Sequence, residues 1–120
     1  MSEEIHVLIL EDEPIVGLAL EDMLGSVGTW QVTLLTRIEE AEAYLATRSP
    51  AFAILDVNIH GRLSYGVADR LQDSGIPYFF ATGYGDRTHP PRHASAPTVT
   101  KPYTTNDIER GIAKVLGEED

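Results

Sequence analysis

Short apolar runs alternate with amphipathic segments along the chain. The first run, residues 5–10 (IHVLIL), is almost continuously apolar, which is typical of a strand that is covered on both faces. Similar runs predict strands at residues 30–35, 51–55, 76–81 and 97–100. We therefore expect five short strands.

Helical periodicity fills the first two intervals between these runs. After Pro14, apolar residues recur every three or four positions, which predicts a helix that Gly25 and Gly28 close. The spacing of Thr36 and Glu39 is that of a capping box and predicts the start of a second helix. The apolar stripe of the first helix comprises Val16, Ala19, Leu20, Met23, Leu24 and Val27, and that of the second comprises Ile38, Ala41 and Leu45.

The second half of the chain has weaker helical signals. Residues 67–72 predict a short helix that stops at Ser74 and Gly75, and Thr104 or Thr105 is expected to cap a last helix. The segment between the last two strands, residues 84–96, has two prolines and few apolar residues. We predict a loop or a short, frayed helix there.

Alternating strands and helices imply an α/β fold, a parallel sheet with helices on both faces. Right-handed crossovers place the carboxyl ends of all strands at one edge of this sheet, where ligands of open α/β sheets bind. The chain has 120 residues, which fits one domain, so we expect a single domain over residues 1–120.

Composition excludes several classes of protein. The chain has no cysteine, so thiol nucleophiles, disulfides and cysteine metal sites are absent. The net charge is -10, and residues 1–60 hold most of it, with eleven Asp or Glu against two Arg. Such a surface repels phosphate backbones and favours a divalent cation or a basic protein partner, so no direct nucleic-acid binding is expected. Without an apolar run of about 20 residues or a basic signal-peptide start, we expect a cytoplasmic protein that does not contact membranes.

Chemically active side chains follow the predicted strands. Glu11 and Asp12 come after the first strand, Asp56 after the third, Thr82 after the fourth and Lys101 after the fifth. Three carboxylates at one sheet edge repel one another unless a cation compensates them, and hard oxygen ligands favour Mg²⁺ over zinc. Around such an ion, these groups would suit phosphoryl transfer. Asp56 is the best candidate nucleophile because it stands alone after a strand expected to be central.

The motifs ILEDEP, ILDVN, FATGY and TKPY occur in this order at the strand ends, and together they resemble the receiver domain of bacterial two-component response regulators. The resemblance covers the whole chain. It implies a flavodoxin-like (βα)₅ doubly wound sheet with strand order 2-1-3-4-5. It also implies that Asp56 becomes a 4-aspartylphosphate, with a sensor histidine kinase or a histidine phosphotransferase as donor. Such a domain is not an enzyme in the usual sense, since it catalyses only its own phosphorylation and dephosphorylation, and it signals through a downstream protein partner.

The resemblance also implies roles for individual residues. Mg²⁺ would be bound by Asp12, Asp56 and the backbone carbonyl of Asn58, with Glu11 acting through water. Thr82 would bind a phosphoryl oxygen and Lys101 would pair with the phosphate across a cis Lys101–Pro102 peptide. Asn58 and Tyr84 would flank the attacking water and tune the phosphate lifetime, although both also fit as ordinary loop residues.

Residues 80–85 (FATGYG) further resemble the FAT-GUY type of single-domain receiver. This subgroup implies a partner kinase of the HWE or a related class. The chain departs from the wider family at Thr98, where receivers usually carry the aromatic residue that couples to the active-site hydroxyl. His60, His89 and His93 have no metal-ligand spacing and are predicted to be solvated loop histidines.

Two other functions fit part of the pattern. Phosphatases of the haloacid dehalogenase type also place a nucleophilic Asp after a strand, but they need a second Asp two positions later, where this chain has Asn58. A degenerate receiver that only docks to partners is the other alternative. Nucleotide-binding folds are disfavoured because no glycine-rich phosphate loop follows the first strand.

The weak helical pattern of residues 84–96 leads to a prediction about switching. We expect the backbone order of this segment to change when Asp56 is phosphorylated, because it has few apolar residues to hold one conformation. NMR relaxation measured on both states tests this expectation. Unchanged relaxation across the segment would contradict it.

Overall fold

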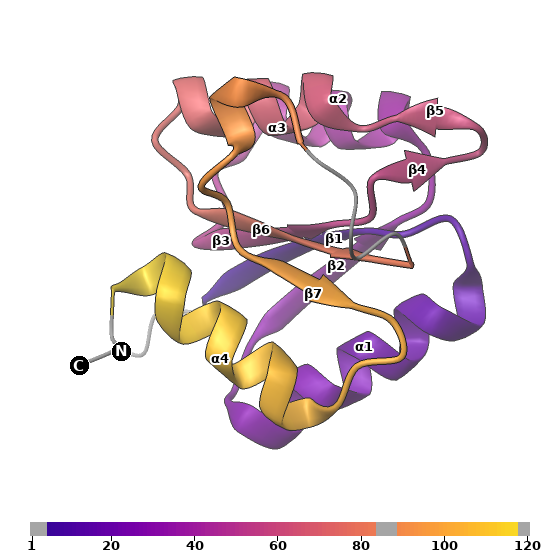
Figure 1. Cartoon of the computed structure of the whole chain (residues 1–120), viewed down its shortest axis with the longest axis vertical. Helices are drawn as coiled ribbons and strands as arrows, with labels where there is room; N and C mark the ends of the chain where they lie inside the picture. Colours follow the sequence, from indigo (N-terminus) through magenta and orange to yellow (C-terminus); the bar gives the residue numbers. More distant parts are fainter. Residues whose placement is uncertain (1–4, 84–88, 118–120) are drawn as a thin grey trace.

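The computed structural model describes residues 5–83 and 89–117. Its main sheet has five parallel strands in the order β2-β1-β3-β6-β7 (Figure 1). Counting these strands along the chain, the order is the predicted 2-1-3-4-5, and the fold is flavodoxin-like. The strands are β1 (His6–Leu10), β2 (Gln31–Leu35), β3 (Phe52–Leu55), β6 (Tyr78–Thr82) and β7 (Thr98–Thr100).

Two helices cover each face of the sheet. Figure 1 shows α1 (Pro14–Val27) and α4 (Thr105–Leu116) on one face, and α2 (Ile38–Thr47) and α3 (Tyr65–Asp73) on the other. Each face has its own apolar core. Phe79 and Phe80, neighbours on β6, are both fully buried and point into different cores, as the alternation of side chains along a strand requires.

The helix ends agree only partly with the sequence predictions. Thr104 begins α4 with a complete capping box, since its side chain accepts from the Asp107 N–H and the Asp107 carboxylate accepts from the Thr104 N–H. The capping box predicted for Thr36 is wrong, because α2 starts one residue later and has no side-chain cap. Instead, the Glu40 carboxylate accepts from the Thr36 N–H at 3.3 Å.

The helix α1 also differs in detail from its predicted pattern. It continues through Gly25 and ends at Gly28, because Gly25 has open space around it and needs no unusual backbone angle. Ala19 is exposed and Gly17 is buried in its place. A Cβ at Gly17 would lie 2.8 Å from a methyl carbon of Leu34, so the absence of a side chain lets α1 lie close to β2.

The connection from β3 to α3 contains a short hairpin that the sequence pattern did not indicate. Strands β4 (Asn58–Ile59) and β5 (Arg62–Leu63) pair in antiparallel fashion. The turn residues His60 and Gly61 have φ angles of 51° and 83°, and glycine adopts this left-handed region without strain. The hairpin carries Ile59 into the core, where it is 1% exposed.

Only a 3₁₀ turn at Pro91–His93 lies between β6 and β7 in the described part of this connection. Residues 84–88, and with them Tyr84, lie outside the described residues. The predicted loop or short helix agrees with this 3₁₀ turn at the described residues 89–96. The expected change of order on phosphorylation stays a prediction.

The prediction of solvated loop histidines is wrong for His93, and His89 is half-buried. His93 is 1% exposed, with its Nε2 at 2.7 Å from the Asp69 carboxylate and its Nδ1 hydrogen-bonded with the Tyr78 hydroxyl. His89 lies between the Tyr65 hydroxyl and the Thr98 hydroxyl, each at 2.7 Å. His60 is exposed, as predicted. His93 is buried by partners on α3 and β6, which lie 24 and 15 residues away in sequence.

Within residues 5–83 and 89–117, no helix combines the length and the apolar character that a bilayer span requires.

The buried position of His93 predicts a stability effect. His93→Asn should lower the free energy of unfolding by about 2–4 kcal/mol, because it leaves a gap in the core and removes polar partners from Tyr78 and Asp69. Urea denaturation measures the change. The same replacement at exposed His60 is the control and should change stability by less than about 0.5 kcal/mol. Equal effects at both positions would contradict the prediction.

Candidate functional site

The strand order brings the predicted site residues to one edge of the sheet. The Asp56 N–H donates to the Leu10 carbonyl at 2.9 Å, which places the end of β3 beside the end of β1. The Lys101 N–H donates to the Thr82 carbonyl at 2.9 Å, which joins the end of β7 to the end of β6. The peptide between Lys101 and Pro102 is cis, as expected.

Lys101 is the cation at the centre of this edge. Its Nζ lies 2.8 Å from Glu11 Oε1, 3.0 Å from Asp56 Oδ2 and 3.5 Å from Glu13 Oε1. The Glu11 and Asp56 side chains are only 2% and 7% exposed, whereas the Glu13 side chain is 65% exposed. The lysine therefore compensates two buried carboxylates and one at the surface.

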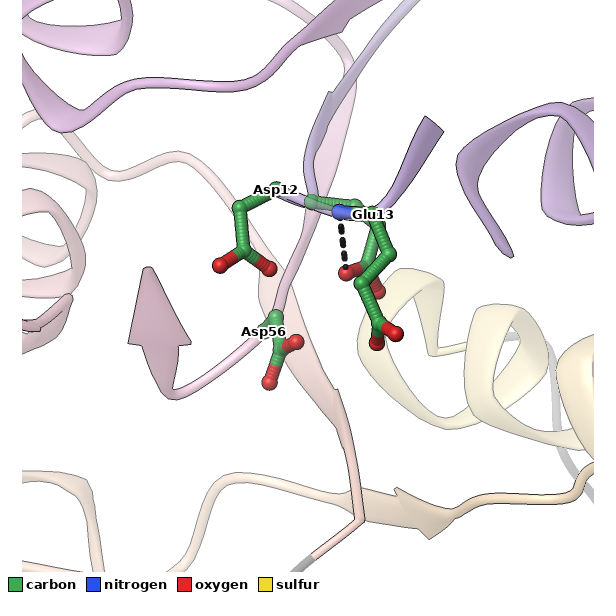
Figure 2. A group of neighbouring side chains, drawn as sticks. Asp12, Glu13 and Asp56 are labelled. Atoms are coloured by element: carbon green, nitrogen blue, oxygen red, sulfur yellow. Dashed lines mark hydrogen bonds between the residues drawn. The ribbon is translucent and has the colours of Figure 1, made fainter. Parts of the chain in front are cut away.

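Glu11, Asp12, Glu13 and Asp56 offer carboxylate oxygens that all lie within 4.8 Å of one another. Figure 2 shows the carboxylates of Asp12, Glu13 and Asp56 gathered beside the ends of β1 and β3. Such a set of hard oxygen donors fits a Mg²⁺ ion, which takes oxygen ligands and retains several waters. An open cavity of about 580 Å³ provides that space and is lined by Asp12, Glu13, Asp56, Asn58, Gly83 and Lys101.

Local hydrogen bonds hold the acidic loop and the phosphoacceptor candidate in place. Glu11 Oε2 accepts from the Glu13 N–H at 3.1 Å, the bond drawn in Figure 2. Asp12 Oδ2 accepts from the His60 N–H at 2.9 Å. The Ser64 hydroxyl donates to the backbone carbonyl of Asp56 at 2.6 Å. The chain that follows β3 thus holds the Asp12 side chain through His60 and the Asp56 backbone through Ser64.

Of the other predicted site residues that the structure describes, Asn58 lines this cavity and Thr82 immediately precedes the lining residue Gly83. Asn58 is half-buried, and its N–H donates to Asp56 Oδ1 at 3.4 Å while its side-chain oxygen accepts from the Gly61 N–H at 2.8 Å. Thr82 is fully buried at the end of β6. Glu13 is the residue that sequence analysis did not assign to the site. It looked like one of several acids before a helix, and only its approach to Lys101 distinguishes it.

The charges of the site alter its proton equilibria. Burial raises the pKa of Glu11 to about 7, against the lowering effect of its hydrogen bond with Lys101. For Lys101, burial acts to lower the pKa, but the hydrogen bonds with Glu11 and Asp56 outweigh it and raise the pKa. Burial and the nearby Glu11 charge raise the pKa of Tyr103 to about 12. The site keeps Lys101 charged and brings the titration of Glu11 to around neutral pH.

The sequence and the fold of the chain were compared with those of known proteins. No family model matches the chain. The solution structure of SdrG from Sphingomonas melonis Fr1 shares 34% sequence identity and a TM-score of 0.83, with 97% of this chain and 99% of that chain covered. Response regulator Rre1 from Synechocystis is 25% identical over 126 residues, covering 99% of this chain. The chain spans about half, 54%, of the length of Rre1.

A second similar solved structure holds a metal ion. It is the receiver domain of the sensor histidine kinase PA1611 from Pseudomonas aeruginosa, with magnesium coordinated in its active-site cleft. That domain is 20% identical, has a TM-score of 0.80, and is covered over 99% of its length and 96% of this chain. At this identity the likeness concerns the fold.

The raised pKa of Glu11 predicts a pH dependence of stability. Below pH 4.5, the ordinary pKa of a Glu side chain, the Glu11 carboxyl is mostly protonated in both the folded and the unfolded chain. Between pH 4.5 and about 7, the unfolded chain loses the proton first, so the free energy of unfolding should fall as pH rises through this window. Denaturation without Mg²⁺ at several pH values measures the fall.

Comparison with variants isolates the part that Glu11 contributes. Glu11→Gln should flatten the fall between pH 4.5 and about 7, while Glu21→Gln, which removes an exposed carboxyl from α1, should leave it unchanged. A fall of the same size in all three proteins would show that Glu11 does not titrate in this range.

Proposed function

The chain belongs to the response regulator receiver domains of two-component signalling, and we propose that it accepts a phosphoryl group on Asp56 in a Mg²⁺-dependent reaction. The donor would be a sensor histidine kinase or a histidine phosphotransferase, and the phosphorylated chain would signal through contacts with a downstream protein. The observation that carries the proposal is the pairing of Asp56 Oδ2 with Lys101 Nζ at 3.0 Å beside the acidic cavity.

The geometry of Asp56 suits a nucleophile. Its carboxylate is nearly buried at the cavity wall, and its backbone is held by Leu10 and Ser64. An attacking oxygen held in a fixed direction reaches phosphorus in line with less loss of entropy. Lys101 would then pair with the phosphoryl oxygens and lower the cost of their negative charge. Thr82, at the end of the neighbouring strand, would donate its hydroxyl to one of these oxygens.

Asp12, Asp56 and the backbone carbonyl of Asn58 would hold Mg²⁺, with Glu11 acting through water. Bound there, Mg²⁺ would neutralise charge on the transferred group. The donor set is consistent with this role because it consists of oxygens alone and includes more negative charge than Lys101 compensates. Asn58 and Tyr84 would tune the lifetime of the phosphate.

The surroundings of the site suit a protein donor. On α1, directly after the acidic loop, Ile15 and Leu18 are 82% and 60% exposed, and large exposed apolar side chains favour contacts with another protein. The FATGYG motif supports a place in the FAT-GUY subgroup and a partner kinase of the HWE or a related class. Such a circuit would operate in the cytoplasm. The output contact would involve α4 and residues 84–100.

A direct test uses acetyl phosphate and Mg²⁺ followed by intact-protein mass spectrometry. We expect one phosphoryl adduct on the wild-type protein and none on Asp56→Asn. Asp12→Asn should need about tenfold or more Mg²⁺ for the same rate, because it removes a carboxylate from the metal site. Asp22→Asn, an exposed position on α1, is the matched control and should behave as wild type.

Other outcomes separate the alternatives. Continuous hydrolysis of a phosphomonoester would favour a phosphatase of the haloacid dehalogenase type. The absence of an adduct at any Mg²⁺ concentration would favour a module that only docks to partners. An adduct that survives Asp56→Asn would contradict the assignment of the phosphorylated residue.

A further inference from the structure

Glu13 stands directly before a helix that its side chain does not cap. It is the N-cap of α1, and its carboxylate accepts no hydrogen bond from the helix. The residues that commonly cap a helix start are the shorter Ser, Thr, Asp and Asn. Here the carboxylate instead lies 3.5 Å from Lys101 Nζ. Its backbone is held by the bond from the Glu13 N–H to Glu11 (Figure 2).

Glu13 also lies on the outer side of the site. Its side chain is 65% exposed, against 2% for Glu11 and 7% for Asp56, and it lines the open cavity with Asp56 and Lys101. A phosphoryl group that approaches Asp56 through this cavity therefore passes the Glu13 carboxylate and meets a lysine that already contacts it.

Charge counting shows what this fourth carboxylate changes. Above about pH 7, where Glu11 is ionised as well, four carboxylates and one lysine carry three net negative charges, and a bound divalent cation would reduce these to one. Without Glu13 the same site would be neutral under these conditions. Glu13 thus adds a negative charge that makes the loaded site less favourable for an incoming anion.

We propose that Glu13 is a specificity-determining residue that disfavours free dianionic phosphodonors by competing with the phosphoryl group for Lys101. The inference rests on the proposed function. A phosphohistidine presented by a protein is held at the site by contacts over a wider surface. Repulsion by one carboxylate therefore removes a smaller fraction of its binding free energy. A small dianion has only the charges of the site to hold it.

The reaction used to test this is transfer from acetyl phosphate. An Asp56 carboxylate oxygen forms a bond to phosphorus while the bond from phosphorus to the acetyl oxygen breaks, and acetate leaves with that electron pair. The product is the acyl phosphate of Asp56. The charge of the donor can be varied, because acetyl phosphate is doubly negative at neutral pH and phosphoramidate carries a single net negative charge.

Phosphorylation rates of wild type, Glu13→Gln and Glu21→Gln, each at saturating Mg²⁺, test the proposal. Glu21 lies on the same helix, is exposed, and controls for net charge. Glu13→Gln should react with acetyl phosphate about threefold to tenfold faster than wild type at low salt, with a smaller gain for phosphoramidate. The gain should shrink at about 0.5 M salt, where the screening length is only a few ångströms.

Binding of inorganic phosphate in the presence of Mg²⁺, followed by the amide shift of Gly83, provides a second readout. It should tighten in Glu13→Gln and not in Glu21→Gln. Equal or slower reaction of Glu13→Gln with acetyl phosphate, or an equal gain with both donors that salt does not reduce, would overturn the role of Glu13 and leave the proposed function standing. A wild-type protein that forms no adduct would overturn the proposed function and this inference with it.

Discussion

The ion pairs of Lys101 with Glu11 and Asp56 are the interaction on which the rest of the site depends. Two nearly buried carboxylates at the ends of neighbouring strands repel each other, and neither has enough water around it to screen its charge. Lys101 lies 45 residues from Asp56 in sequence and reaches it only because β7 pairs with β6 in the observed register. The order of the strands therefore also brings the positive charge of Lys101 to the negative charges of Glu11 and Asp56.

This arrangement leaves the site with more acid than base. Lys101 contacts three carboxylates at once, so any anion that joins them must share or displace one of these contacts. The carboxylates of the two buried partners, Glu11 and Asp56, accept from backbone N–H groups, whereas the Glu13 carboxylate is at the surface and accepts no hydrogen bond from its helix. When an anion binds Lys101, the contact between Lys101 and Glu13 would therefore be the first to be displaced. In the buried part of the site, burial raises the pKa of Glu11, and the Asp56 charge adds to the effect.

On the other side of the sheet, a cluster of tyrosine and histidine side chains joins α3 to the chain between β6 and β7. Tyr65 follows Ser64, whose hydroxyl binds the Asp56 carbonyl, and its own hydroxyl binds His89. His89 in turn contacts the hydroxyl of Thr98, the position where related domains usually carry an aromatic residue. Polar side-chain contacts therefore connect the segment after Asp56 to β7, which leads to Lys101.

Local pattern alone was sufficient for the five strands of the main sheet, for most positions on the face of the first helix and for the residues at the strand ends, because burial on both faces and a 3.6-residue repeat leave direct signatures in a sequence. It failed where a distant partner decided the outcome. Thr36 does not cap α2, because the helix starts one residue later than predicted. His93 became buried because Tyr78 and Asp69 satisfy both of its ring nitrogens. Glu13 differs from other helix-leading acids only through a lysine from the opposite end of the chain. The amino-acid sequence alone thus determined which side chains stand at the edge of the sheet. The tertiary structure decided which of these side chains are in contact, because distances between side chains depend on strand register and helix packing, and no local pattern contains these.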